Sequence, residues 1–170
     1  MGKKSIKVDK NIYQISREEL GLTRKEASEL LEFISESRIE KIESGKSSVQ
    51  PDEVLQMARV YRKPHLCNNF CSQECPIGKE YVPEVQIKSL PQIVLEMLNS
   101  LNKLDSDKKR LIEITSDGNI TTDEIGDFVK IKKGLEEISL AVDSLNLWVD
   151  SMIASGKIDK DAIANETKEG

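Results

Sequence analysis

Between Asn11 and Tyr61 the apolar residues recur every three or four positions, in short runs that turn-forming residues interrupt. This spacing places apolar side chains on one face of a helix, so four or five short helices around a common core account for the stretch. Aromatic residues make up only 4% of the 170 residues, and the core must therefore consist mainly of Leu, Ile and Val. That mix favours an all-α fold over a β-sandwich or barrel.

Capping residues define the ends of these helices. Gly21 suits the left-handed conformation that closes a helix, and the run Thr23–Glu26 has the Thr-x-x-Glu form of a capping box. Ser35 is placed to cap the next helix, which ends at Gly45. A further helix begins after Pro51 and Asp52.

The second half of the chain carries two longer apolar series. One steps by four and three through Leu90, Val94, Met97, Leu101 and Leu104. The other keeps a heptad spacing through Phe128, Ile131, Leu135, Ile138, Val142, Leu145, Val149 and Met152. The heptad series predicts one long helix that ends at Gly156, and residues 108–115 can add a shorter helix. The long helix is a candidate dimer interface, or it packs against the first series in an intramolecular bundle.

These patterns divide the chain into four segments. We expect a domain of short helices at residues 1–66, a cysteine-containing segment and linker at 67–86, a helical bundle or dimerisation domain at 87–156, and a flexible tail at 157–170.

The two halves differ in charge. Residues 1–66 contain 13 Lys and Arg against 11 Asp and Glu, which gives +2, whereas residues 67–170 contain 12 against 19, which gives −7. Any contact with phosphates is therefore expected in the first half. The acidic second half is better suited to self-association or to binding another protein.

No apolar run approaches the roughly 18 residues that span a bilayer, and Lys3 and Lys4 lead into no hydrophobic signal region. We therefore expect a cytoplasmic protein that does not enter the membrane. Three cysteines cannot all pair within one chain, so a disulfide framework is not expected.

One segment carries a family resemblance. Gly21-Leu22-Thr23-Arg24-Lys25-Glu26-Ala27-Ser28-Glu29-Leu30-Leu31, followed by Ser35-Glu36-Ser37-Arg38-Ile39-Glu40-Lys41-Ile42-Glu43-Ser44-Gly45-Lys46, resembles the helix-turn-helix of the Cro and lambda-repressor type. The likeness extends over roughly residues 11 to 63. It implies a transcription regulator that binds double-stranded DNA as a dimer. The turn departs from the family pattern, since Glu32-Phe33-Ile34 stands where a glycine and one apolar residue are expected.

The resemblance also implies which residues face DNA. Ile39 and Ile42 would face the core, which leaves the other side of their helix for the major groove. The expected DNA-facing residues are Arg24, Ser35, Glu36, Ser37, Arg38, Lys41 and Lys46. Because this helix also carries Glu36, Glu40 and Glu43, whose carboxylates repel phosphates, we expect one copy to bind weakly.

The cysteine segment allows three interpretations. Cys67, Cys71 and Cys75 are spaced by four, so on a helix they would line one face. Together with His65 they supply the ligand types of a zinc site, and thiolates also hold iron–sulfur clusters. Alternatively the thiols only pack as small apolar groups, or they form a redox-responsive pair.

The segment Glu113–Glu124 imitates a calcium-binding loop, with glycine sixth and glutamate twelfth, but it lacks the leading aspartate. A helix stop at Gly118 and a capping box from Thr121 to Glu124 explain the same residues.

Three functions are compatible with the sequence. They are a dimeric repressor or activator, a protein-interaction adaptor that uses the helix-turn-helix as a scaffold, and a metal- or redox-sensing regulator. An enzyme is not expected, because His65 is the single histidine and no nucleophile elbow or phosphate-binding glycine loop occurs.

Overall fold

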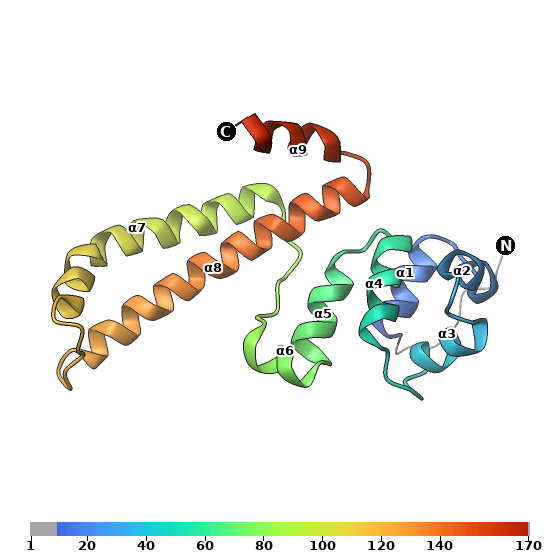
Figure 1. Cartoon of the computed structure of the whole chain (residues 1–170), viewed down its shortest axis with the longest axis horizontal. Helices are drawn as coiled ribbons and strands as arrows, with labels where there is room; N and C mark the ends of the chain where they lie inside the picture. Colours follow the sequence, from blue (N-terminus) through green and yellow to red (C-terminus); the bar gives the residue numbers. More distant parts are fainter. Residues whose placement is uncertain (1–9, 170) are drawn as a thin grey trace. The chain divides into compact units, whose positions relative to one another are not determined.

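The structure is a computed structural model that describes residues 10–169. Within this range every regular element is an α-helix, which confirms the predicted all-α class (Figure 1). The helices are α1 (Ile12–Glu19), α2 (Arg24–Leu31), α3 (Glu36–Glu43), α4 (Pro51–Val60), α5 (His65–Gln73), α6 (Pro76–Tyr81), α7 (Leu90–Thr115), α8 (Ile125–Ala154) and α9 (Lys160–Glu169). Val85–Val149 forms one compact unit, and the residues before and after it make up the other.

The first helices begin and end at the capping residues that the sequence predicts. The Thr23 hydroxyl accepts from the N–H of Glu26 at 3.2 Å, and the Glu26 carboxylate accepts from the N–H of Thr23 at 2.7 Å. Ser35 caps α3 by accepting from the N–H of Arg38. Gly45 follows α3 with a φ of +71°, and a Cβ there would meet nothing within 4 Å, so the backbone conformation alone favours glycine.

Side chains from α1 to α5 build the core of the N-terminal unit. Its buried apolar residues are Tyr13, Ala27, Leu31, Ile34, Ile39, Ile42, Val49, Val54, Met57, Ala58, Tyr61 and Leu66. Phe70 and Cys67 of α5 pack against this cluster. In addition, the Tyr13 hydroxyl donates to Oε1 of Glu74 at 2.6 Å, which joins α1 to the end of α5. The helical packing of this unit therefore continues past residue 66.

Helices α7 and α8 form an antiparallel hairpin that residues 116–124 connect (Figure 1). Three ion pairs cross it: Lys103–Glu137 at 3.1 Å, Asp107–Lys130 at 3.0 Å and Arg110–Asp127 at 2.6 Å. The most buried apolar side chains of the hairpin are Ile93, Ile114, Ile131 and Ala141. The predicted long helix is confirmed, because α8 ends at Ala154 and Gly156 follows with a φ of +72°.

The structure differs from the sequence-based expectation in two helices. The helix expected at residues 108–115 is the continuation of α7, since neither Gly nor Pro interrupts the stretch that precedes it. In the segment expected to be a flexible tail, residues 160–169 form α9. The predicted cap before α8 is present, because the Glu124 carboxylate accepts from the N–H and the hydroxyl of Thr121 at 3.0 and 2.6 Å.

Candidate nucleic-acid interface

Helix α3 has an apolar face toward the core and a polar face toward solvent. Ile39 and Ile42 are 0% and 3% exposed, as predicted, and both belong to the core cluster. Every exposed residue of α3 is polar or charged: Glu36, Ser37, Glu40 and Lys41. A helix with no bulky apolar group on its outer face can enter a major groove about 12 Å wide. The geometry of α3 is therefore compatible with reading base edges.

The turn between α2 and α3 bends sharply at Glu32. This residue has φ 60° and ψ −69°, and the N–H of Phe33 donates to the carbonyl of Leu31 at 2.7 Å. The arrangement is a γ-turn with positive φ, which is a strained conformation for a residue that has a Cβ. The turn allows Leu31 before it and Ile34 after it to be buried together. This is how the chain forms the turn without the glycine expected there.

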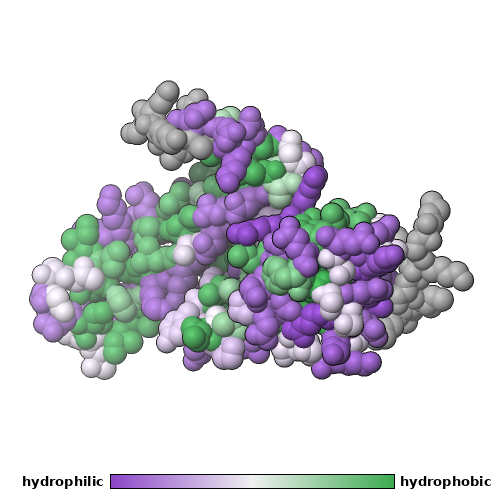
Figure 2. All heavy atoms as spheres, turned by 45° about the vertical axis from the view of Figure 1, so that its right-hand side comes forward, coloured by the Kyte–Doolittle hydropathy of each residue, from purple (hydrophilic) through white to green (hydrophobic). Residues whose placement is uncertain are grey.

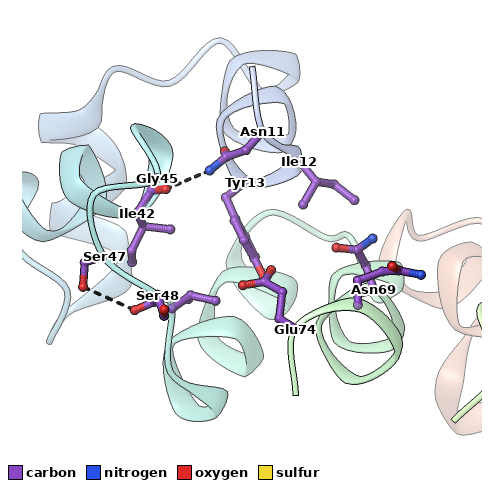
Figure 3. A pocket seen from close by; sticks show the side chains of 11 residues that line it. Asn11, Ile12, Tyr13, Ile42, Gly45, Ser47, Ser48, Asn69 and Glu74 are labelled. Carbon is purple, nitrogen blue, oxygen red and sulfur yellow. Dashed lines mark hydrogen bonds between the residues drawn. The ribbon is translucent and has the colours of Figure 1, made fainter. Parts of the chain in front are cut away.

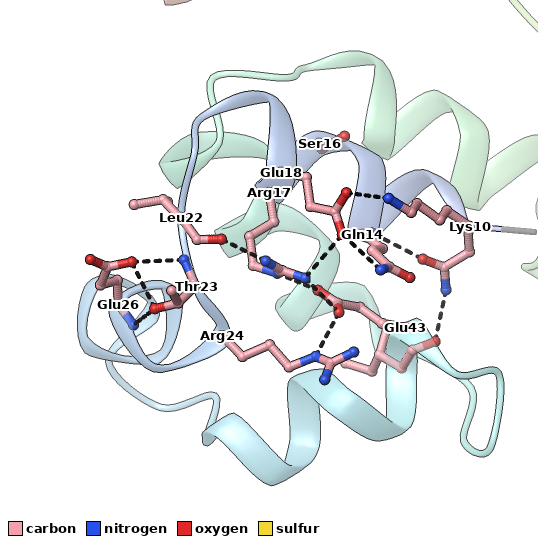
Figure 4. Close-up of polar contacts among 12 residues, drawn as sticks. Lys10, Gln14, Ser16, Arg17, Glu18, Leu22, Thr23, Arg24, Glu26 and Glu43 are labelled. Atoms are coloured by element: carbon pink, nitrogen blue, oxygen red, sulfur yellow. Dashed lines mark hydrogen bonds and ion pairs between the residues drawn. The ribbon is translucent and has the colours of Figure 1, made fainter. Parts of the chain in front are cut away.

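A buried ion-pair network joins α1, α2 and α3 (Figure 4). Arg17 donates from Nε to Oε1 of Glu43 at 2.6 Å and from Nη2 to Oε2 at 2.9 Å. Arg24 donates from Nε to the same Oε2 at 2.8 Å. The Glu43 side chain is only 1% exposed, and two guanidinium groups compensate its charge. Glu43 thus points into the domain, so it does not add to the repulsion of phosphates expected from the carboxylates of α3.

A second ion pair fixes the start of α3 to α4. Arg38 donates from Nε and Nη2 to the two carboxylate oxygens of Glu53 at 2.6 and 2.7 Å. The same guanidinium donates to the Ser47 hydroxyl at 2.5 Å and to the Ser48 carbonyl at 2.8 Å. The hydrogen bonds from Arg38 lower the pKa of Glu53 against the opposing effect of burial. Arg38 therefore holds α3, α4 and the segment between them in one arrangement.

Comparison with known proteins agrees with this geometry. A family model described as helix-turn-helix matches residues 15–66. These residues form a helix-turn-helix domain of the Cro and lambda-repressor type. The family consists of DNA-binding regulators. No curated protein and no solved structure matches the chain.

The helix-turn-helix domain presents most of the expected DNA-facing residues to solvent. The exposed ones are Ser35, Glu36, Ser37, Lys41 and Lys46. Arg24 and Arg38 are half-buried instead, because Glu43 and Glu53 bind their guanidinium groups. Both arginines therefore stabilise the packing of helices within the domain.

The sequence does not single out Arg17 or Glu53 as functional residues, and it indicates Glu43 only as a carboxylate that repels phosphates. Arg17 and Glu43 are 26 positions apart, and Arg38 and Glu53 are 15 apart, so no local spacing rule relates them. The weak signal available was the position of Glu43 one turn after Ile39, on the face of α3 that the apolar periodicity assigns to the core.

The cysteine segment forms two helices and not one. Cys67 and Cys71 lie one turn apart on α5, whereas Cys75 precedes α6, where its Sγ accepts from the N–H of Gly78 at 3.5 Å. Burial raises the pKa of the Cys67 thiol, with a smaller contribution from Cys71. His65 begins α5, and burial lowers its pKa. Among residues 10–169 no three His, Cys, Asp or Glu side chains are grouped as metal ligands, so the predicted set of four is not assembled.

A hollow of about 500 Å³ lies beside the end of α3 (Figure 3). It is bordered by α1, by the segment between α3 and α4, and by α5. The side chain of Asn11 donates to the carbonyl of Ile42 at 2.8 Å on one side, and Tyr13 contacts Glu74 on the other. Burial, together with the bond to Glu74, raises the pKa of the Tyr13 hydroxyl, which keeps it a donor.

In the part of the chain that the structure describes, each helix is too short or too polar to span a bilayer.

Proposed function

We propose that this protein is a sequence-specific transcription regulator that binds DNA as a dimer and reads base edges with α3. The observation that carries the proposal is the division of α3 into a buried side, Ile39 and Ile42, and an exposed polar side. The buried side fixes the helix on the domain. The exposed side is free to enter the groove.

The exposed residues differ in what they can recognise. Ser35, Glu36 and Ser37 stand at the first turn of α3, where a hydroxyl can bond to any base edge and a carboxylate accepts from the N4 amino group of cytosine. Lys41 and Lys46 are exposed cations that suit phosphates. Arg24 and Arg38 act at the edge of this surface, where Glu43 and Glu53 orient their guanidinium groups.

The small net charge of one domain supports DNA binding as a dimer. Residues 1–66 carry a net charge of only +2, so a single copy gains little from phosphate neutralisation. Two linked domains convert the second contact into an intramolecular one, which multiplies the affinity for two half-sites on successive turns of the duplex. Two half-sites related by the symmetry of a dimer form an inverted repeat.

A binding selection tests the proposal. The purified, reduced chain is incubated with pooled random duplexes at two salt concentrations, and the bound sequences are determined. We expect an inverted repeat to be enriched and the affinity to fall steeply with salt. Lys41→Gln should lower the salt slope by about 1, the effect of one lost phosphate contact. Lys109→Gln is the control, because that side chain is 92% exposed on α7 and lies outside the domain. Failure to enrich any sequence at either salt would exclude the proposal.

A protein-interaction adaptor is the second candidate, and the observation that favours it is the exposed apolar surface of the α7–α8 hairpin beside the −7 charge of residues 67–170. For an adaptor, Lys41→Gln and Lys46→Gln leave partner binding unchanged.

A further inference from the structure

The turn between α2 and α3 carries an apolar side chain on its outer side. Phe33 is 59% exposed, which is the largest fraction among the large apolar side chains of residues 15–66. Leu31 before the turn and Ile34 after it are 0% and 1% exposed. The turn therefore buries two of its three apolar residues and leaves an aromatic ring, which has a large apolar area, in contact with solvent.

The backbone conformation of Glu32 produces this arrangement. Its φ of 60° and ψ of −69° reverse the chain, and the N–H of Phe33 donates to the carbonyl of Leu31 at 2.7 Å. Strained backbone of this kind persists where the surrounding structure requires it, and it is concentrated at active sites and ligand-binding sites. The strain lies in the residue directly before Phe33, which points to a use for the exposed ring.

Phe33 lies beside the end of α3 that is proposed to read bases. It precedes Ser35, the N-cap of α3, by two residues, so their Cα atoms are at most about 7.6 Å apart. Ser35 is exposed, and its hydroxyl lies 3.1 Å from the hydroxyl of Ser37 in the first turn of the helix. The Phe33 ring is therefore continuous with the polar surface that the start of α3 presents.

The surface around Phe33 is polar and includes two carboxylates. Glu32 and Glu36 are exposed, and most of the surface of the first helices, at the right of Figure 2, is hydrophilic (purple). The carboxylates disfavour contact with the phosphate backbone, so the ring is better suited to base edges. The apolar group that base edges present in the major groove is the 5-methyl group of thymine, and phenylalanine is one of the side chains that contact it.

We propose that Phe33 contacts the 5-methyl group of one thymine in each half-site and selects thymine at that position. The inference rests on the proposed function, because it requires α3 to lie in the major groove. It adds a specificity-determining residue that lies outside α3. Ser35, Glu36 and Ser37 bond to the polar groups of base edges, whereas Phe33 recognises a methyl group by removing it from water.

Replacement of thymine by uracil tests the contact, because uracil differs from thymine only in lacking the methyl group. The inverted repeat that the unmodified chain selects is synthesised with uracil at each thymine in turn, in both half-sites. Fluorescence anisotropy measures the affinity of the reduced, full-length chain for each duplex. We expect one position at which uracil lowers the affinity about fourfold per half-site, the effect of one methyl group. Phe33→Ala should bind thymine and uracil equally at that position.

Two further variants control for effects on the fold. Tyr81→Ala is the matched control, because Tyr81 is an exposed aromatic residue of the same compact unit and lies outside residues 15–66. It should keep the full preference for thymine. Phe33→Leu replaces the ring by a smaller apolar side chain and should keep part of the preference. Circular dichroism confirms that each variant is helical.

Equal effects of uracil on the unmodified chain and on Phe33→Ala at every position would overturn the inference. A selected repeat without thymine would overturn it as well. In both cases an inverted repeat has been selected, so the proposed function stands. A chain that selects no sequence refutes the proposed function, and the inference falls with it.

Discussion

Arg38 at the start of α3 and Glu53 at the start of α4 share two hydrogen bonds, Nε to Oε1 at 2.6 Å and Nη2 to Oε2 at 2.7 Å. Glu53 also accepts from the N–H of Gln50 at 2.8 Å, so one carboxylate caps α4 and holds α3. The position of the candidate reading helix therefore depends on a residue of the next helix. The Arg38–Glu53 pair therefore affects both the stability of the domain and the position of the helix proposed to recognise DNA.

Arg38→Lys should destabilise the helix-turn-helix domain by about 2 kcal/mol, the usual contribution of hydrogen bonds to a charged group. A lysine cannot form the two parallel bonds to Glu53 or reach Ser47 and Ser48 at the same time. Urea unfolding followed by circular dichroism measures the effect. Lys41→Ala is the control, since Lys41 is exposed on the same helix, and it should change stability by less than about 0.5 kcal/mol. Equal stability of Arg38→Lys and the unmodified chain would contradict the structural role of Arg38.

The same pair predicts a dependence of stability on pH. Arg38 lowers the pKa of Glu53 below its ordinary 4.5 in the folded chain. Stability that depends on the ionised Glu53 is therefore complete above pH 4.5 and is lost as the pH falls through the lower pKa of the folded state. Urea midpoints measured from pH 7 to pH 3 should converge for the unmodified chain and Glu53→Gln in the acid range. A constant difference between them at every pH would show that Glu53 does not titrate in this way.

Glu43→Ala should destabilise the domain much more than Arg24→Ala. Removing the Glu43 carboxylate takes away both hydrogen bonds that the Arg17 guanidinium, whose side chain is 7% exposed, makes to it, and breaking a buried pair costs about 3–5 kcal/mol. The Arg24 side chain is 36% exposed, and Glu43 still binds Arg17 when Arg24 is removed. Arg24→Ala should therefore lower the stability of the domain by less than about 1 kcal/mol. Thermal unfolding of the two variants compares them directly. Similar losses of stability in the two variants would contradict the larger role of the buried Arg17–Glu43 pair.

Glu32→Gly should stabilise the domain by about 1 kcal/mol. Glycine adopts positive φ without a steric cost, and the relief of strain at φ 60° exceeds the entropy that glycine loses on folding. Glu29→Gly is the control, because Glu29 lies within α2 and the same change there should destabilise by about 1 kcal/mol. Unfolding in urea gives both values, and a loss of stability in Glu32→Gly would refute the strained γ-turn.

The sequence predicts the features of this domain that depend on neighbours along the chain. Thr23 and Glu26 are three residues apart, Ser35 caps the helix that follows it, and Ile39 and Ile42 share one face of a single helix. The exposure of Glu36, Ser37 and Lys41 follows from the same periodicity. Local rules of capping and spacing are sufficient for all of these.

Contacts between distant residues could not be predicted in this way. Arg24 and Arg38 have the charge and position of DNA contacts, yet which carboxylate binds each of them depends on how α2, α3 and α4 pack. The spacing of the three cysteines by four suggests one helical face, but Pro76 begins a new helix and Cys75 becomes its cap. Val94 and Leu101 of the predicted α7 series are 42% and 43% exposed, because the residues of α7 that are covered depend on how α8 packs against it.

The central claim is that the exposed face of α3 reads the bases. It is tested most directly by repeating the selection from random duplexes with Ser37→Ala, Glu36→Gln and, as a phosphate-contact control, Lys46→Gln. We predict that the unmodified chain enriches an inverted repeat, that the two α3 variants change the preferred bases within each half-site, and that Lys46→Gln weakens binding without changing them. Enrichment of the same sequence by all four proteins, or of no sequence by any, would contradict the claim.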